Sequence, residues 1–334
     1  MLKVFFTRLI VGALAAAAAC SGPSQSPSAS GVPSLTNPPS VLNRLAHAPA
    51  APAGKSWMSP GAKSAALLYV SNFGSGTVNV YSYPAMKQLG VLVGFEEPEG
   101  ICVDAAQDAY LVDFGAAQIV EYGHGSIAPL RVLNDHQGAP FNCAVDPDTG
   151  DLAVANVNEP PSMDGNVIVY RGAKGTPTKY TAPGFTNCYF VGYDPAGNLF
   201  VDGVNGSSVT VLAELAKGKS AFKSIVMNEA ISMPGGVAWD GTLLAVGDQL
   251  ANTIYQFKVS GNKATEQGST ALNGAVQVSQ FWFTGSTSKH PQATAVLGAD
   301  FGQNEADQWQ YPAGGTPVKT ITGLDEPEGI ALSK

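Results

Sequence analysis

Short runs of alternating apolar and polar residues, each ended by Gly, Pro, Asn or Asp, fill the chain from Leu67 onward. Such alternation is typical of β-strands with one buried face, and no stretch keeps the 3.6-residue period of an amphipathic helix. The clearest runs form one series: Leu68–Val70, Tyr110–Val112, Leu152–Val154, Leu199–Val201, Leu244–Val246 and Ala295–Leu297. The pattern predicts an all-β protein made of short, regularly spaced strands.

Three elements recur in the same order along this region. The pentapeptide Glu-Pro-Glu-Gly-Ile occurs at 97–101 and again at 326–330, with weaker versions between the two copies. The segments that contain these copies end at residues 104, 146, 194, 240, 285 and 333. Successive ends are therefore 42, 48, 46, 45 and 48 residues apart. A further strand in each unit ends in a large apolar residue: Tyr81, Tyr122, Tyr170, Leu212, Phe257 and Tyr311. With a fourth strand such as Val318–Ile321, a unit of this length is typical of a propeller blade.

The two ends of the repeated region complement each other. It begins with a second-strand segment, Leu67–Ser71, and finishes with a first-strand segment, Glu328–Leu332. One blade built from both segments would close a ring and remove the open sheet edges. The sequence therefore predicts an all-β, six-bladed β-propeller over residues 65–334, closed by a blade shared between the N- and C-terminal strands.

The N-terminal region has a different pattern. Lys3 and Arg8 precede an apolar run, Leu9–Ala19, that is too short to span a bilayer but suits a signal-peptide core. Residues 21–64 are rich in Ser, Pro and Ala and show no sustained periodicity. We therefore predict a signal peptide over residues 1–20 and a disordered, semi-extended tether over residues 21–64.

The end of the signal peptide reads Ala17-Ala18-Ala19-Cys20 and resembles a bacterial lipobox, although Ala17 stands where Leu is usual. The resemblance implies that Cys20 becomes the lipidated first residue of a cell-envelope lipoprotein of the outer membrane, periplasm or cell surface. Cleavage at an A-x-A site is the alternative, and it would leave Cys20 unmodified in a secreted protein. Membrane contact is expected only through a lipid anchor at Cys20.

Composition limits the partners. Hydrophobic residues make up 45% of the chain and charged residues 13%, which excludes a wholly disordered protein and disfavours coiled coils. The net charge is −8, and loss of Lys3 and Arg8 with the signal peptide gives 16 − 26 = −10. Because no basic stripe is visible, nucleic acid is not an expected partner. The sequence predicts a monomer that binds an unidentified protein or small molecule.

Two family resemblances follow from the repeats. The element Pro-x-Gly-[Ile/Val]-x-x-Asp, with Gly-Asn-Leu-Phe-Val-Asp at 197–202, resembles the NHL-repeat propellers. Tyr-Val-Ser-Asn at 69–72 with Gly-Ser-Gly-Thr-Val at 74–78 is similar to the YVTN-type propeller repeat. These families include lactonases, a streptogramin lyase and many binding modules, so the resemblance implies a fold and does not select an activity. We favour a binding scaffold.

Polar residues at the start of the innermost strands are the candidate binding residues: Glu99, Asn142, Asn187, Gln280 and Glu328. In six-bladed lactonases a calcium ion sits in the central channel. That resemblance implies Ca²⁺ ligands here at Glu99, Asn142, Asn187 and Glu328. The family's Asp is missing, and the fourth blade offers only Gly235 and Gly236. A lactonase-type metal-dependent hydrolase or a streptogramin-lyase-like enzyme is the rival function, and simple solvation of the channel mouth is the other alternative.

Other catalytic signatures are weak. There is no Gly-x-Ser-x-Gly element, and the histidines show no zinc-ligand spacing. These histidines are His47, His124, His136 and His290. The streptogramin lyase family uses a His as a base, but none of the four matches its motif. Cys102, Cys143 and Cys188 fall on three consecutive innermost strands, where buried free thiols and a Cys143–Cys188 disulfide both remain open.

Overall fold

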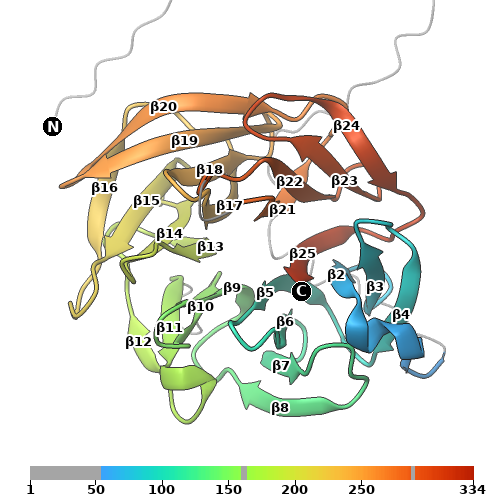
Figure 1. The fold of residues 1–334 in the computed structure, drawn as a ribbon. Helices are drawn as coiled ribbons and strands as arrows, with labels where there is room; N and C mark the ends of the chain where they lie inside the picture. Colours follow the sequence, from blue (N-terminus) through green and yellow to red (C-terminus); the bar gives the residue numbers. More distant parts are fainter. Residues whose placement is uncertain (1–53, 159–163, 287–289) are drawn as a thin grey trace, which may run out of the picture. The chain divides into compact units, whose positions relative to one another are not determined.

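The computed structural model describes residues 54–158, 164–286 and 290–334, all of which belong to one compact unit (Figure 1). Apart from two short 3-10 helices, η1 (Pro60–Ser64) and η2 (Arg171–Ala173), its regular structure is β. Within the described ranges no helix is long and apolar enough to span a bilayer. The predicted signal peptide, Cys20 and most of the predicted tether lie outside the described residues.

Antiparallel sheets radiate from a common centre, and strands of equal rank carry equivalent parts of the repeat (Figure 1). The innermost strands are β5 (Pro98–Val103), β9 (Pro140–Val145), β13 (Asn187–Tyr193), β17 (Pro234–Trp239), β21 (Val278–Thr284) and β25 (Pro327–Ser333). The second strands are β2 (Ala66–Asn72), β6 (Ala109–Asp113), β10 (Leu152–Asn156), β14 (Leu199–Val204), β18 (Leu244–Asp248) and β22 (Ala295–Asp300). Both series coincide with those predicted from the repeats.

The outer strands complete each sheet. The third strands are β3 (Thr77–Tyr83), β7 (Gln118–Tyr122), β11 (Asn166–Tyr170), β15 (Thr210–Leu215), β19 (Thr253–Ser260) and β23 (Glu305–Gln310). The fourth strands are β4 (Gln88–Val93), β8 (Pro129–Asn134), β12 (Thr178–Tyr180), β16 (Lys223–Met227), β20 (Lys263–Ala271) and β24 (Gly314–Ile321). The predicted fourth strand is therefore present in every repeat, although β12 has only three residues.

The number of separate sheets differs from the prediction. Four sheets stand alone, whereas the fourth and fifth repeats form one eight-stranded sheet in the order β13-β14-β15-β16-β20-β19-β18-β17. The junction is a short parallel pairing of β16 with β20, in which Val226 lies opposite Lys263 and Met227 opposite Ala264. The all-β, propeller-like arrangement is thus confirmed, while six fully separate blades are not.

The ring closes through the chain ends. Strand β25 pairs with β2, with Leu68 opposite Leu332 and Val70 opposite Ile330, so one sheet holds both ends of the repeated region. Each innermost strand contacts the next one along the chain, and β21 contacts β25. The predicted shared blade is therefore observed, and no innermost strand is left without a neighbour on either side.

The folded region starts earlier than the sequence indicated. Strand β1 (Trp57–Met58) pairs with β4 at the outer edge of the closing sheet, and η1 follows it. Ala62 of η1 is completely buried in the hydrophobic core between this sheet and the next. The predicted tether boundary at residue 64 therefore moves to Trp57, because a Ser/Pro/Ala-rich composition does not reveal one buried Ala and a two-residue strand.

Apolar side chains fill the spaces between neighbouring sheets. Six clusters of buried residues occur in the described structure, and each contains residues of consecutive repeats. One example packs Leu67 and Tyr69 of β2 against Ile101 and Leu111 of the following sheet. Because each repeat buries its apolar faces only against its neighbours, stability depends on keeping the ring complete.

Candidate functional site

All six innermost strands carry an irregularity near their start, where the predicted site residues lie. The pairing with the second strand shifts register there, so that two residues of the innermost strand oppose one residue of its partner. Such a bulge re-aims side chains and bends the strand. It creates two rows around the centre. The first row is Glu99, Phe141, Tyr189, Gly235, Ser279 and Glu328, and the second row is Gly100, Asn142, Phe190, Gly236, Gln280 and Gly329.

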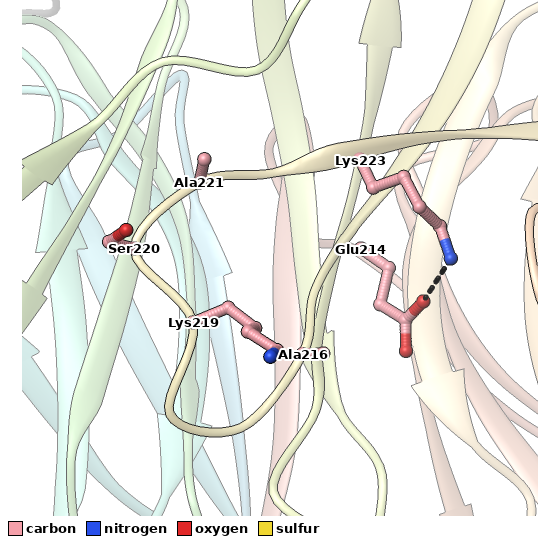
Figure 2. A pocket seen from close by; sticks show the side chains of 6 residues that line it. All are labelled: Glu214, Ala216, Lys219, Ser220, Ala221 and Lys223. Atoms are coloured by element: carbon pink, nitrogen blue, oxygen red, sulfur yellow. Dashed lines mark ion pairs between the residues drawn. The ribbon is translucent and has the colours of Figure 1, made fainter.

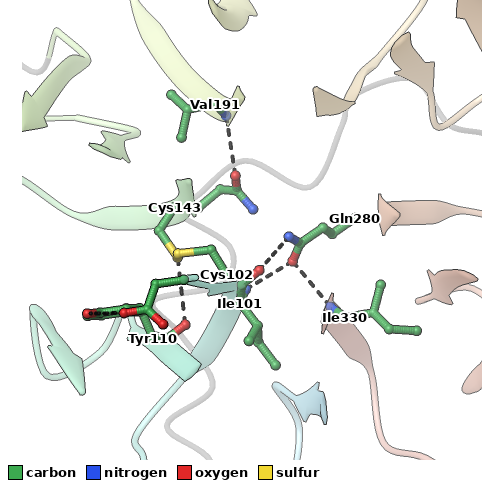
Figure 3. The surroundings of a disulfide bond; sticks show 9 residues. Ile101, Cys102, Tyr110, Cys143, Val191, Gln280 and Ile330 are labelled. Atoms are coloured by element: carbon green, nitrogen blue, oxygen red, sulfur yellow. Dashed lines mark hydrogen bonds between the residues drawn. A yellow bond between two sulfur atoms is a disulfide. The ribbon is translucent and has the colours of Figure 1, made fainter. Parts of the chain in front are cut away.

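Gln280 in the second row holds two other strands (Figure 3). Its Oε1 accepts hydrogen bonds from the backbone N–H of Ile101 at 3.0 Å and of Ile330 at 3.2 Å, and its Nε2 donates to the Ile101 carbonyl at 2.7 Å. The side chain is 7% exposed. A predicted binding residue therefore links β21 with β5 and β25 and leaves little of its amide for a ligand.

Asn142 also joins neighbouring innermost strands. Its Oδ1 accepts the backbone N–H of Val191 in β13 at 3.3 Å, and the residue is 2% exposed. A Cβ placed on Gly100 would lie 2.5 Å from Asn142 Nδ2, so glycine at position 100 provides the space that this amide fills. Asn142 and Gly100 occupy the same row.

The two glutamates belong to the first row and are both buried. Glu99 and Glu328 are 1% and 2% exposed, and they lie on the neighbouring strands β5 and β25. The Ser279 hydroxyl lies 2.5 Å from Glu328 Oε2. Ser71 accepts the Gly329 N–H at 2.7 Å and donates to the Glu99 carbonyl at 2.5 Å, so it ties the backbones of the two strands together.

Asn187 lies in neither row. Counting back four residues from Asp146 gives Asn142, whereas the same count from Asp194 gives Phe190 and not Asn187. Asn187 stands at the start of β13, where its Nδ2 donates to the Val157 carbonyl at 3.0 Å. The similarity between Asn142-Cys143 and Asn187-Cys188 in the sequence suggested a shared position that the strand register does not give them.

The predicted calcium ligands do not assemble as one set. Calcium takes six to eight oxygen ligands at about 2.3–2.6 Å. Of the four predicted residues, Asn187 lies outside the rows and the Asn142 oxygen already accepts a backbone N–H. Within the described residues no cluster of three or more His, Cys, Asp or Glu side chains has a metal-binding arrangement.

The cysteines pair differently from the disulfide considered in the sequence. Cys102 of β5 and Cys143 of β9 form a disulfide with a Cα–Cα separation of 5.6 Å, joining two neighbouring innermost strands (Figure 3). Cys188 is free and completely buried, and burial raises the pKa of its thiol, with the Asp202 charge adding to the effect. Cys143 is bonded to Cys102, and Cys188 lies three residues before Val191, the counterpart of Cys143 in β13.

A second set of polar residues was missed in the sequence. An Asp or Asn lies at or near the end of every second strand: Asn72, Asp113, Asn156, Asp202, Asp248 and Asp300. Several of them hold the loop that leads into the innermost strand. For example, Asp113 Oδ1 accepts the N–H groups of Glu96 and Glu97 at 3.0 and 3.1 Å. The sequence shows one Asp or Asn at this place in each repeat, so the set could have been recognised. These side chains have a structural role.

Asp202 departs from this set because it lies opposite the bulge. Its Oδ1 accepts the Phe190 N–H at 3.0 Å, and the backbone N–H of Gly235 in the next repeat also hydrogen-bonds to this carboxylate. The side chain is completely buried, and burial raises its pKa well above the ordinary range of aspartate even though both hydrogen bonds act in the opposite direction. Asp202 thus ties β13 to β17, as Ser71 ties β25 to β5.

The loops at one end of the propeller have a one-sided charge. We call this the mouth end, meaning the loops that lead into the innermost strands and the loops that join second to third strands. Its acidic residues are Glu96, Glu97, Asp135, Asp164, Glu229, Asp325 and Glu326. None of the Lys or Arg residues in the described structure lies in these loops. Those found in loops of the opposite end are Lys87, Arg171, Lys174, Lys217, Lys219 and the terminal Lys334.

Exposed aliphatic side chains accompany these acids. Val209, Leu250 and Val276 are 56%, 44% and 55% exposed, and they belong to mouth-end loops of three consecutive repeats. Glu229 lies in another mouth-end loop of the same part of the ring. These side chains place exposed apolar area at the same end of the molecule as the acids.

A hollow of about 350 Å³ lies elsewhere, within one hairpin (Figure 2). It is lined by Glu214, Ala216, Lys219, Ser220, Ala221 and Lys223, which come from β15, β16 and the turn between them. Lys223 pairs with Glu214 at 3.7 Å, and its side chain is 53% exposed. The hollow is formed by the turn between β15 and β16 and by one ion pair that is partly exposed to solvent. It involves no residue of the two rows.

Comparisons with known proteins give likeness in fold alone. No model of a known protein family matches the sequence, and no curated protein matches it. Among solved structures, a chain of a nidogen/laminin complex matches with a TM-score of 0.65 at 13% identity, covering 80% of this chain and 98% of that one. A protein of unknown function from Bacteroides caccae matches with a TM-score of 0.61 at 12% identity, covering 81% and 100%.

The sheets, the central rows and these likenesses together define the class of protein. It is an all-β, propeller-like protein in which most polar residues near the centre hold the innermost strands together. At such low identities the shared fold carries no activity or partner from the solved structures to this chain.

Proposed function

We propose that the protein is an exported binding scaffold. Its mouth end binds a protein partner that presents basic and apolar side chains. The observation that carries this proposal is the one-sided charge of the mouth end. Among the described residues, the mouth-end loops hold acids together with Val209, Leu250 and Val276 and hold no Lys or Arg, whereas the loops of the other end hold both acids and bases. A surface of this kind attracts a basic partner and repels an acidic one.

The central rows support the same proposal. The amide oxygens of Gln280 and Asn142 accept backbone N–H groups of neighbouring strands. Of the predicted calcium ligands, Asn187 lies outside the two rows. The centre therefore supplies rigidity, and the loops supply the accessible surface. We also propose that the eight-stranded sheet counts as two blades, which gives an NHL-like six-bladed ring with one repeat per blade.

The test is a charge reversal at each end. Glu96→Lys with Asp325→Lys changes two exposed mouth-end residues, and Lys174→Glu with Lys217→Glu is the matched change at the opposite end. The probe is a lysine-rich amphipathic peptide, measured against the full chain at low and high salt. We expect the mouth-end variant to lose at least about tenfold in affinity and the control to lose none, with binding weakened by salt.

Two results would contradict the proposal. Equal binding of the peptide by both variants would show that the mouth end is not the docking surface. Stronger binding of an acidic peptide than of the basic peptide by the unaltered chain would show that the charge of this end does not select the partner.

A further inference from the structure

Strand β8 is the outer edge of its sheet, and among the described strands nothing pairs on its far side (Figure 1). The other outermost strands are protected. β1 pairs with β4, and β16 pairs with β20. β12 has only three residues, and β24 contains Pro317, which has no N–H to donate. β8 has six residues, and its single proline, Pro129, is the first of them. In the described part of the chain it is therefore the edge best suited to accept another strand.

The hydrogen bonds to β7 show which backbone groups of β8 point outward. The Asp135 N–H, directly after β8, donates to the Ala117 carbonyl at 2.8 Å. The pairing continues from there without a shift as far as Arg131. Because every second pair of an antiparallel ladder is hydrogen-bonded, Leu133 and Arg131 also direct their backbone groups to β7. The N–H and C=O of Val132 therefore point away from the sheet.

The neighbouring sheet limits how much of this edge is open. The Asn134 carbonyl, at the end of β8, accepts the hydroxyl of Tyr170 in β11 at 3.2 Å. The edge is thus already in contact with the next sheet at Asn134. Its open part lies around Val132 and toward Pro129.

Apolar side chains are exposed along the open part of the edge. Ile127, in the turn before β8, is 47% exposed, and Leu130 and Val132 are 59% and 45% exposed. Val132 lies opposite Val120, which is buried in the cluster shared with the closing sheet. The Val132 side chain is therefore on the face of β8 that is turned toward the closing sheet. A strand added here would cover apolar surface and also pair with the backbone of Val132.

The opposite face of β8 carries exposed positive charge. Arg131 forms an ion pair with Glu121 at 3.4 Å, and its Nη1 donates to the Ala173 carbonyl in η2. The Arg131 side chain is 40% exposed, whereas that of Glu121 is 8% exposed. Arg171 and Lys174, on either side of this contact in η2 and just after it, are also exposed. The accessible charge beside the edge is therefore basic.

We propose that the outer edge of β8 binds an extended segment of a partner protein in which apolar residues alternate with acidic residues. Successive side chains of a strand point to opposite faces. The apolar residues of the segment cover Leu130 and Val132, and its acidic residues face Arg131 on the other side. Backbone pairing supplies affinity and the alternation supplies specificity, as in other cases of strand addition. This surface is separate from the mouth end.

Charge favours an acidic segment over a second copy of the chain. Two copies paired through β8 would bring Arg131, Arg171 and Lys174 of each copy toward those of the other, and like charges repel. Asp151 offsets part of the basic charge, since its Oδ1 accepts the Gly172 N–H at 2.8 Å. The three basic side chains still outnumber the accessible acid beside them, so an acidic strand is attracted.

The first experiment titrates the full chain with a peptide of alternating Val and Glu residues. Val132→Glu removes exposed apolar surface from the edge and adds a repelling charge. Val318→Glu is the matched control, because Val318 is 50% exposed on the proline-containing edge strand β24. We expect Val132→Glu to lose at least about tenfold in affinity and Val318→Glu to bind as the wild type does. The wild-type affinity should be below that of the lysine-rich peptide for the mouth end, because few backbone groups contribute.

The second experiment tests backbone pairing and needs no variant to fold. The residue opposite Val132 shares its face and directs its N–H to β8, so it is an apolar residue of the peptide. N-methylation of every Val of the peptide should therefore abolish binding to the wild-type chain. N-methylation of every Glu should leave binding intact, because those N–H groups point to solvent.

The third experiment tests the charge. Arg171→Glu with Lys174→Glu should weaken binding of the Val-Glu peptide, whereas Lys217→Glu with Lys219→Glu, in the turn between β15 and β16, should not. Four results would overturn the proposal. They are no binding of the Val-Glu peptide, equal binding of a Val-Lys peptide, equal effects of the two N-methylated peptides, and a dimer of the wild-type chain that Val132→Glu dissociates. The last result would show that a second copy occupies the edge.

Discussion

A single buried carboxylate determines part of the pH response expected of this fold. Asp307 in β23 is 1% exposed, and its Oδ1 accepts the Thr320 hydroxyl at 2.5 Å. The pKa of Asp307 is raised to about 6, and burial is the largest cause. The Thr320 hydrogen bond opposes the rise, and the charges of Glu305 and Asp300 add to it. The folded state therefore holds a proton on this side chain at pH values at which the unfolded chain has released it.

We predict that Asp307→Asn stabilises the protein at about pH 8 by about 1–2 kcal/mol. The sign follows because a raised folded pKa costs stability as the pH rises from the unfolded value near 4 to about 6, and the full cost persists above that range. Asparagine keeps an oxygen for Thr320 and carries no charge. Chemical denaturation at about pH 4 and about pH 8 checks the prediction, with the exposed loop variant Asp325→Asn as the control. A stabilisation of equal size at both pH values would contradict it.

Individual site residues were only partly predictable from the sequence. The sequence located Gln280, Asn142 and Glu328 on the right strands, because the repeat fixes their distance from a turn. It could not show that the Gln280 side chain reaches Ile101 two sheets away, since that contact depends on how the innermost strands are placed around the centre. It misplaced Asn187, because a bulge in each strand makes register depend on counting from the following turn.

At the scale of strands and sheets, prediction succeeded where one physical rule repeats. Strands with alternating apolar residues recur every forty-odd residues, and a mistake in one repeat is corrected by the others. The pairing of β16 with β20 occurs once and involves two residues of each strand, so no repeated signal announces it. Strand β1 is similar, because Trp57 and Met58 are recognisable as a strand only through their partners Val91 and Gly90.

The disulfide between β5 and β9 should contribute measurably to stability. Its cysteines are 41 residues apart, and closing a loop of this length removes unfolded-state entropy worth about 4 kcal/mol. We predict that the double variant Cys102→Ala, Cys143→Ala unfolds at lower denaturant concentration than wild type and no longer responds to reductant. Cys188→Ala is the control, and it should retain the response of wild type. Thiol titration shows when the wild-type disulfide is fully reduced. If the denaturant midpoint of unfolding is then unchanged, a stabilising role of the disulfide is contradicted.

For the whole molecule, ring closure explains why both chain ends carry unusual contacts. Strand β25 supplies the innermost strand of a sheet whose other strands come from the N-terminal side, so this sheet is complete only when both ends of the repeated region are in place. Ser333, Ser71 and Gln280 each add side-chain hydrogen bonds at this joint, and they link β25 with the sheets on both sides. The joint with the largest sequence separation is thus held by side-chain hydrogen bonds on both sides as well as by the pairing of β25 with β2.

Attachment of the molecule to a membrane is predicted to depend on one residue outside the described structure. If Cys20 carries a lipid, the acyl chains supply the membrane affinity at about 0.8 kcal/mol per buried CH₂. Cys20→Ser should therefore move the protein from the membrane fraction to the soluble fraction of expressing cells, while Ser24→Ala, in the same predicted tether, should leave it with the membranes. Fractionation and immunoblotting measure the distribution. Wild-type protein that is already soluble, or a Cys20→Ser variant that stays with the membranes, would refute lipid attachment at Cys20 and leave the binding scaffold to be delivered as a secreted protein.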